Sequence, residues 1–289
     1  MGVVVITGTS SGIGQASALA FARAGHRTIA TLRDLAKAEP LREARESEGL
    51  DLELQALDVA SPASVAEAVG AILAREGRVD VLVNNAGIGG ACPLEDVLEE
   101  EHRWIFEVNY FGALRMIQAV LPGMREQGSG AIVNVSSGAG RFATPNQVPY
   151  SASKFALEGA SEALAHELAP FGVRVAIVEP GVVATAIFEN SAAFTRYDKH
   201  SPYRDLMRRS GMLYSAGLKR PGDPHHVAEV IVEAALGDAP RLRYLVGQDA
   251  ENLVTGRAGI TDEQFVALGE TMSDDTYREL FREYFGIEL

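Results

Sequence analysis

The sequence predicts an α/β fold in which helices cover both faces of a doubly wound parallel sheet. Two observations predict it. Short runs of β-branched residues alternate with segments of helical period along most of the 289 residues, as in chains built from βαβ units. The strand candidates are also near-continuous apolar runs, which is typical of a sheet buried on both faces.

Seven strands are expected, because seven short apolar runs are bounded by turn residues or helical segments. In chain order they are Val3–Thr7, Arg27–Thr31, Leu52–Leu57, Val79–Asn84, Ala131–Val135, Val173–Val178 and Arg243–Val246. Helices are expected between them at Gly14–Ala24, 35–48, Pro62–Arg75, Leu98–Gln127, Ser151–Phe171 and Asp223–Leu236.

Several residues at the ends of these helices support the assignment. Gly25 follows the first helix at the position where a left-handed glycine commonly ends one. Ser61 precedes Pro62, and Asp223 precedes Pro224, so each helix has a capping residue followed by proline in its first turn. Pro40 and Pro122 are expected to interrupt the helices that contain them.

Two segments depart from the alternation of strands and helices. Residues 182–222 carry aromatic and methionine side chains among polar residues, and we expect them to form a substrate lid. Residues 251–289 hold nine acidic and three basic residues, with helices expected at Asp262–Leu268 and Asp274–Phe285. We therefore divide the chain into one domain at 1–250 and an acidic helical C-terminal extension at 251–289.

Composition excludes several classes of protein. The net charge of −13 argues against nucleic acid or an anionic membrane as a partner. With Cys92 as the one cysteine, the chain has no internal disulfide and no cysteine-based zinc site, and it fits a cytoplasmic location. The six histidines have no ligand spacing, so we expect no metal. Neither a signal peptide nor a membrane-spanning run is expected.

A glycine-rich turn joins the first strand to the first helix. It reads Gly8-Thr9-Ser10-Ser11-Gly12-Ile13-Gly14, a GxxxGxG spacing. Glycines at such a turn let backbone N–H groups approach a phosphate, and the helix N-terminus favours negative charge. The turn therefore predicts a nucleotide site.

The end of the second strand indicates which nicotinamide cofactor binds. An acid there would bind a ribose 2′-hydroxyl and repel a 2′-phosphate, but Leu32 holds that position and Arg33 follows it. Because a guanidinium pairs well with phosphate, we predict NADP over NAD. The alternative is that Asp34 binds the ribose and Arg33 is a surface charge, and NAD would then be the cofactor.

Tyr150 and Lys154 lie four residues apart, about one helical turn, so they share a helix face. A tyrosine hydroxyl titrates near ~10, and a neighbouring ammonium would lower that pKa. Lowering it to about 7 takes roughly 4 kcal/mol of differential interaction. The pair therefore predicts a general acid/base, although a surface tyrosine beside a solvated lysine would give the same spacing.

Taken together, these motifs resemble the classical short-chain dehydrogenase/reductase family over residues 3–185. The motifs are TGTSSGIG at 7–14, Asp58-Val59, Asn84-Asn85-Ala86-Gly87, Asn109, Ser137, Tyr150-x-x-x-Lys154 and Pro180-Gly181-Val182-Val183-Ala184-Thr185. Within the family, TLRDL, YSASKFALEG and RLRYLVG look most like the 17β-hydroxysteroid dehydrogenase type 1 and retinol dehydrogenase branch. The resemblance implies a Rossmann-type fold and, through the long helices near 98–127 and 151–171, a homodimer or homotetramer.

The resemblance also implies site residues. The catalytic set would be Ser137, Tyr150, Lys154 and Asn109, with Asn109 supporting a proton-relay water. Lys154 and Tyr150 would also contact the cofactor, together with Gly8, Ser10, Ser11, Gly12, Ile13, Gly14, Arg33, Asp58, Val59, Asn85, Ala86, Gly87, Pro180, Gly181, Val183 and Thr185. In carbonyl reduction negative charge develops on the substrate oxygen, which Ser137 would stabilise and Tyr150 would protonate.

The loops beyond the strand ends indicate the substrate class. They bring apolar residues toward the pocket, namely Pro93, Leu94, Phe142, Val148, Phe188, Phe194 and Met212. A hydrophobic ketone or alcohol, such as a steroid, retinoid or aryl compound, fits them best, although Arg196, Lys199, Arg204 or Arg208 could recognise an acid. The alternatives are an NAD-dependent dehydrogenase, a catalytically silent nucleotide-binding protein and an extended-type dehydratase or epimerase. The GxxxGxG spacing argues against the last.

Overall fold

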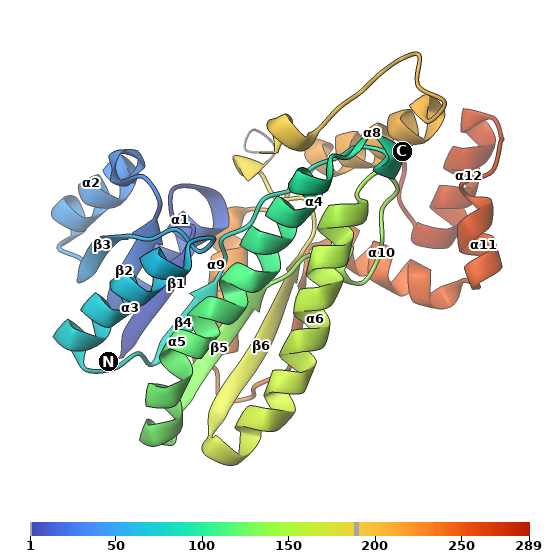
Figure 1. Cartoon of the computed structure of the whole chain (residues 1–289). Helices are drawn as coiled ribbons and strands as arrows, with labels where there is room; N and C mark the ends of the chain where they lie inside the picture. The colour runs from blue at the N-terminus through green and yellow to red at the C-terminus, as the bar shows by residue number, and fades with distance from the viewer. Residues whose placement is uncertain (1, 188–190) are drawn as a thin grey trace.

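The computed structural model describes residues 2–187 and 191–289. Within them, seven parallel strands form one sheet in the order β3-β2-β1-β4-β5-β6-β7 (Figure 1). The strands are β1 (Val3–Thr7), β2 (Arg27–Leu32), β3 (Leu52–Ala56), β4 (Val81–Asn84), β5 (Gly130–Val135), β6 (Val173–Pro180) and β7 (Arg243–Val246). The prediction of a doubly wound parallel sheet is confirmed, and each predicted strand lies within two residues of an observed one.

Helices cover both faces of the sheet, as Figure 1 shows. They are α1 (Gly12–Arg23), α2 (Glu39–Glu48), α3 (Pro62–Glu76), α4 (Glu99–Phe106), α5 (Gly112–Gln127), α6 (Val148–Leu168), α8 (Arg204–Lys219), α9 (Pro224–Leu236), α10 (Gln248–Gly259), α11 (Asp262–Ala267) and α12 (Asp274–Phe285). In the described ranges, none of them is long and apolar enough to cross a membrane.

Two apolar cores follow from the alternation of side chains along the strands. Val4 and Ile6 of β1 point to the face covered by α1, α2 and α9, while Val3 and Val5 point to the face covered by α3, α5 and α6. Successive side chains of a strand project to opposite faces, so one apolar run supplies both cores. The chain folds as a single domain around this sheet.

The long helical segment that was predicted at Leu98–Gln127 differs from expectation in where its irregularity lies. Pro122 does not interrupt it, because α5 continues to Gln127 with Val120 and Met124 buried on either side of the proline. Packing against the core thus outweighs the lost backbone donor. The irregularity comes earlier, as a π-helical turn, η3 (Glu107–Phe111), between α4 and α5. Such turns often mark functional sites.

The chain after residue 200 contains two helices that the sequence did not predict, α8 and α10. The residues from α10 onward pack on the domain through a third apolar cluster, which includes Phe281 and Phe285 of α12, Phe142 after β5 and Leu213 of α8. Residue 251, where the extension was expected to begin, lies within α10. Because Phe142 follows β5, this cluster brings α10, α11 and α12, at the right of Figure 1, close to the carboxyl end of the sheet.

Candidate active site

A cavity of about 910 Å³ opens at the carboxyl ends of β1, β4, β5 and β6. The strand order turns back between β1 and β4, and open α/β sheets bind ligands at such a point. Of the residues expected in the site, all except Asn109 line the cavity: Gly8, Ser10, Ser11, Gly12, Ile13, Gly14, Arg33, Asp58, Val59, Asn85, Ala86, Gly87, Ser137, Tyr150, Lys154, Pro180, Gly181, Val183 and Thr185.

The glycine-rich turn between β1 and α1 is built for close approach. A Cβ on Gly14 would lie 2.3 Å from the carbonyl oxygen of Gly8, and a Cβ on Gly12 would lie 2.7 Å from Thr185. Asn85 fixes the start of the turn, because its side-chain amide donates to the carbonyl oxygens of Thr7 at 3.0 Å and Gly8 at 3.1 Å.

The start of α1 fits the phosphates of a dinucleotide. Its N-cap, Ser11, makes no side-chain cap hydrogen bond, and its first turn carries no acidic residue. The N–H groups at this helix end are therefore not capped by a side chain or opposed by a carboxylate, and they can donate to an anion.

The two candidates for ribose recognition have different surroundings. Arg33 is exposed, lines the cavity and makes no ion pair within the described parts of the chain. Asp34 does not line the cavity. Its carboxylate instead caps the short helix η1 (Leu35–Ala38), accepting from the N–H of Ala36 at 3.0 Å.

Tyr150 lies in the first turn of α6, and Ser137 follows β5. The Ser137 hydroxyl hydrogen-bonds to the Tyr150 hydroxyl and accepts from the N–H of Ala139 at 3.1 Å. Burial raises the pKa of Tyr150, and the bond from Ser137 opposes that rise. The sequence predicted that Lys154 would lower this pKa, but in the structure burial has the larger effect and acts in the opposite direction.

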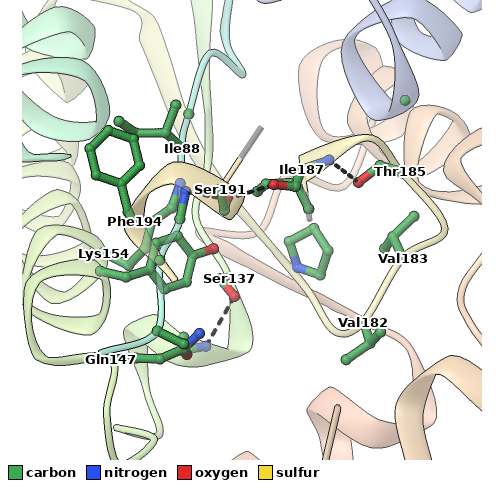
Figure 2. A pocket seen from close by; sticks show the side chains of 18 of the residues that line it. Ile88, Ser137, Gln147, Lys154, Val182, Val183, Thr185, Ile187, Ser191 and Phe194 are labelled. Atoms are coloured by element: carbon green, nitrogen blue, oxygen red, sulfur yellow. Dashed lines mark hydrogen bonds between the residues drawn. The ribbon is translucent and has the colours of Figure 1, made fainter. Parts of the chain in front are cut away.

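Lys154 is one turn farther along α6 and is among the labelled side chains that line the cavity in Figure 2. Its Nζ lies 5.9 Å from the Tyr150 ring centroid and donates to the carbonyl oxygen of Val135 at 2.9 Å. Burial lowers the pKa of Lys154 to about 8, while the nearby Glu158 carboxylate acts to raise it. The ammonium is thus held in place in a site that only partly supports its charge.

Asn109 lies behind the cavity wall and is 2% exposed. It belongs to the π-helical turn η3. Its side chain accepts from the N–H of Ile88 at 2.9 Å, and donates to the Ile88 carbonyl at 2.9 Å and to Ser153 at 3.0 Å. The wide turn thus fixes the loop after β4 against α6, next to Tyr150.

The apolar pocket differs in part from the prediction. Phe142 and Phe194 line the cavity as expected, but Pro93, Leu94, Val148 and Met212 do not. Leu94 and Val148 are exposed to solvent, whereas Pro93 is buried away from the cavity. Phe188 lies outside the described residues. The apolar wall instead includes Met207 and Leu213 of α8, Leu253 of α10 and Ile287 after α12. Met207 and Leu213 are six residues apart, and with no helix predicted there, that spacing did not indicate that both would face the cavity.

Four polar side chains near Tyr150 were also missed. Asn146, in the left-handed conformation with φ 62°, donates to Ser210 of α8 at 3.1 Å. The next residue, Gln147, hydrogen-bonds to Tyr214, one turn after Ser210. All four line the cavity. Two consecutive loop residues thereby hold one face of α8 over the site, and only the α8 helix period could have indicated this.

Asp249, at the start of α10, supports the loop after β6. Its carboxylate accepts from the N–H of Val182 at 2.6 Å, and a Cβ on Gly181 would lie 2.1 Å from it. The helix that the sequence did not predict thus positions Gly181, one of the residues expected to contact the cofactor.

Residues 2–195 match the family model described as short chain dehydrogenase. The chain belongs to the short-chain dehydrogenase family. The mouse 17-beta-hydroxysteroid dehydrogenase type 1 is 40% identical over 253 residues, which cover 84% of this chain and 72% of the relative. Human retinol dehydrogenase 8 is 39% identical over 254 residues, which cover 83% of this chain and 79% of the relative. This protein is accordingly an oxidoreductase that acts on CH–OH donors.

Solved structures agree with this assignment. A short-chain dehydrogenase from Streptomyces avermitilis superposes with a TM-score of 0.80 at 38% identity, covering 93% of this chain and 98% of that one. An alcohol dehydrogenase from Thermococcus sibiricus, solved with 5-hydroxy-NADP, has a TM-score of 0.71 at 28% identity and 85% and 96% coverage. A short-chain dehydrogenase/reductase from Burkholderia phymatum, solved with NAD, has a TM-score of 0.77 at 26% identity. The match covers 94% of this chain and 96% of that one. Members with either nicotinamide cofactor thus share this fold.

Proposed function

We propose that this dehydrogenase uses NADP(H) to interconvert a hydrophobic ketone and its alcohol. The observation that carries the proposal is the environment of Arg33 and Asp34. The guanidinium of Arg33 faces the cavity without an acidic partner among the described residues, whereas Asp34 is engaged as a helix cap. A free guanidinium at the end of β2 suits a 2′-phosphate. The alternative, NAD, would need Asp34 to leave its cap.

The catalytic roles follow from the contacts among three side chains. When bound, the nicotinamide exchanges a hydride with the substrate carbon. In the reductive direction Tyr150 gives its hydroxyl proton to the substrate oxygen, and Ser137 donates a hydrogen bond to the same oxygen. Lys154, anchored on the Val135 carbonyl at 2.9 Å, stabilises the phenolate that remains on Tyr150 and binds the ribose. Asn109 orders the loop after β4, where a relay water would lie.

The raised pKa of Tyr150 is consistent with this role. A tyrosine that is buried and neutral before the reaction holds the proton that the substrate oxygen requires. The cost appears only after proton transfer, when the phenolate must be stabilised. With the Ser137 proton directed at the substrate oxygen, the Lys154 ammonium, whose Nζ lies 5.9 Å from the Tyr150 ring centroid, is the group proposed to do so.

An uncharged, largely apolar substrate suits the cavity walls. Of the four lid cations that could recognise an acid, only Arg196 lines the cavity. Its guanidinium donates to the carboxylate of Glu101 at 2.6 Å, so that charge is already neutralised. Apolar residues of α8, α10 and the C-terminal end supply much of the remaining wall, beside uncharged polar side chains such as Asn146 and Gln147. A steroid, a retinoid or an aryl ketone meets these requirements.

The test is nicotinamide absorbance with NADPH and, separately, NADH, against steroid, retinoid, aryl and short aliphatic carbonyls. We expect turnover with NADPH on the bulky apolar members. Turnover with NADH alone would overturn the cofactor assignment, and tight cofactor binding without turnover would favour a silent nucleotide-binding protein.

A pair of variants tests the general acid. Tyr150→Phe is expected to abolish turnover while cofactor still binds. Tyr203→Phe is the matched control, because it also removes one hydroxyl, but from a tyrosine outside the cavity that donates to Glu95 at 2.6 Å. If Tyr150→Phe keeps most of the activity, the role of Tyr150 is wrong.

We also infer a homodimer or homotetramer formed through α4, α5 and α6; in Figure 1, α6 lies alongside the long helical segment that runs from α4 into α5. Phe111, at the end of η3 immediately before α5, and Phe155 of α6 are 45% and 46% exposed. Large aromatic side chains on adjacent helices give an apolar surface that a second copy of the chain could cover.

A further inference from the structure

A cluster of charged residues lies behind the catalytic residues. Glu158 of α6 is 4% exposed and Glu179 of β6 is 1% exposed. The Nε of Arg243, on β7, lies 3.0 Å from Glu158 Oε2 and 3.2 Å from Glu179 Oε1. Arg141 reaches the same Glu179 oxygen at 3.2 Å. The two acids are buried, while the side chains of Arg243 and Arg141 are 25% and 39% exposed, and we call the four residues the charge cluster.

Each acid of this cluster adjoins a residue of the site. Glu158 follows Lys154 by one turn of α6, so both project from one helix face. Glu179 immediately precedes Pro180, which lines the cavity. The ends of β5 and β6 are paired, with Ser136 N donating to the Val178 carbonyl at 2.8 Å. The cluster therefore packs against the parts of α6, β5 and β6 that carry Lys154 and Pro180.

Glu158 is poised between its two charge states. Burial raises its pKa to about 7, and Glu179 adds to that rise, while Ser136 and Arg243 oppose it. The charged and titratable groups around it are Lys154 and Glu162 on its own helix, Glu179 on β6 and Arg243 on β7. Arg243 is the cation that holds the carboxylate in its ionised form, since it contacts Glu158 directly.

We propose that Glu158 is a positioning residue for Lys154, and that its carboxylate, held by Arg243, keeps the Lys154 ammonium charged at neutral and mildly alkaline pH. The inference rests on the proposed role of Lys154 beside Tyr150. The Lys154 ammonium is buried and donates to the Val135 carbonyl oxygen, a neutral acceptor that does not balance its positive charge. A carboxylate one turn away favours the charged form of the lysine, whereas a neutral side chain there leaves the cost of burial uncompensated.

The sign of the effect is defined. The Glu158 carboxylate raises the pKa of Lys154, so Glu158→Gln lowers that pKa and the ammonium is lost at lower pH. The alkaline limb of kcat against pH should therefore move to lower pH, because the carboxylate that favours the charged form of Lys154 is gone. The pH dependence of NADPH affinity, measured by fluorescence, should shift the same way because Lys154 binds the ribose.

The matched control is Glu162→Gln. Glu162 also pairs with Arg243, at 2.6 Å, but its side chain is 55% exposed and lies one turn farther from Lys154. Its profile should coincide with that of the unaltered protein. Glu158→Asp restores a charge at the position and should recover at least half of the shift. A Glu158→Gln profile that coincides with the unaltered one, or that falls uniformly in height without moving, would overturn the proposal.

Two further variants keep the test decisive. If Glu158→Gln does not fold, Arg243→Met leaves Glu158 in place without its cation, so the carboxyl becomes neutral and the same shift is expected; no shift overturns the proposal. Tyr150→Phe separates the two hypotheses. Retained activity in Tyr150→Phe would overturn the proposed function, whereas an inactive Tyr150→Phe with an unshifted Glu158→Gln profile overturns only the role of Glu158.

Discussion

Replacing Arg33 by alanine should weaken NADPH binding far more than NADH binding. In the structure the side chain is exposed at the cavity edge and makes no ion pair within residues 2–187 and 191–289. Its loss therefore leaves no buried charge uncompensated and should not disturb the fold. The expected effect is confined to a ligand that brings a 2′-phosphate to this position.

The magnitude follows from the exposure of Arg33. A hydrogen bond to a charged group contributes about 1.5–3 kcal/mol, and solvent screening at an exposed site favours the lower end. About 1.4 kcal/mol corresponds to a tenfold change, so the KM for NADPH should rise about tenfold, while the KM for NADH changes less than about twofold. High salt should reduce the difference in KM for NADPH between Arg33→Ala and the unaltered protein, because it screens the attraction between Arg33 and the phosphate.

The assay is initial-rate kinetics with each cofactor at low salt and in about 0.5 M salt, well beyond the concentration at which the Debye length falls below 10 Å. Asp34→Ala is the matched control, because it removes the neighbouring charge and a cap bond of 3.0 Å but no cavity contact. It should lower stability by about 0.5–2 kcal/mol and leave the cofactor ratio unchanged. An unchanged NADPH-to-NADH ratio in Arg33→Ala, or a large change in Asp34→Ala, would refute the reasoning.

Three other predictions concern the phosphate turn, the C-terminal core and assembly. Gly14→Ala places a Cβ 2.3 Å from the Gly8 carbonyl and 2.4 Å from the Asn85 amide, so NADPH should bind at least about tenfold more weakly by fluorescence titration. Phe281→Ala removes the ring of a residue that is 2% exposed and leaves a cavity, so the free energy of unfolding measured with denaturant should fall by about 3–5 kcal/mol. Light scattering should give a dimer or tetramer, and Phe155→Glu should shift it toward the monomer.

Each prediction has a control or an outcome that would contradict it. Gly70→Ala, in α3 with nothing within 4 Å of the added Cβ, should leave NADPH affinity unchanged. Val266→Ala, at a residue 68% exposed, should change stability by less than about 0.5 kcal/mol. A Phe281→Ala protein as stable as the unaltered one would mean that the third apolar cluster contributes little. A monomeric unaltered protein would remove the inferred assembly.

The sheet could be predicted because each strand is a continuous apolar run that both cores require. The helices after residue 200 were harder. In α8, Gly211 and Gly217 lower the helix propensity. In α10 only Ala250 is buried, so that helix gives no strong apolar stripe. The interruption was wrongly expected at Pro122, since propensity cannot show that α5 continues through it with Val120 and Met124 buried.

The nucleotide side of the site could be predicted because its residues lie in contiguous motifs at strand ends, such as Gly8–Gly14. The opposite wall could not, because residues from distant parts of the chain form it. Leu253 and Ile287 meet Phe142 only after the third apolar cluster has formed. The burial that raises the pKa of Tyr150 is likewise a property of the assembled walls, and the spacing of Tyr150 and Lys154 does not contain it.

The two walls of the cavity therefore come from separable lengths of sequence. The residues expected to contact the cofactor all precede position 186, within the range that matches the family model, whereas α8, α10 and Ile287 supply much of the opposite wall. Mutations in the latter can reshape that wall without altering the residues proposed for hydride transfer. A lineage could in this way acquire a new substrate by changing its C-terminal third alone. An engineer could exchange that third between relatives to transfer substrate preference, provided that Asp249, which positions the loop at Gly181, is kept.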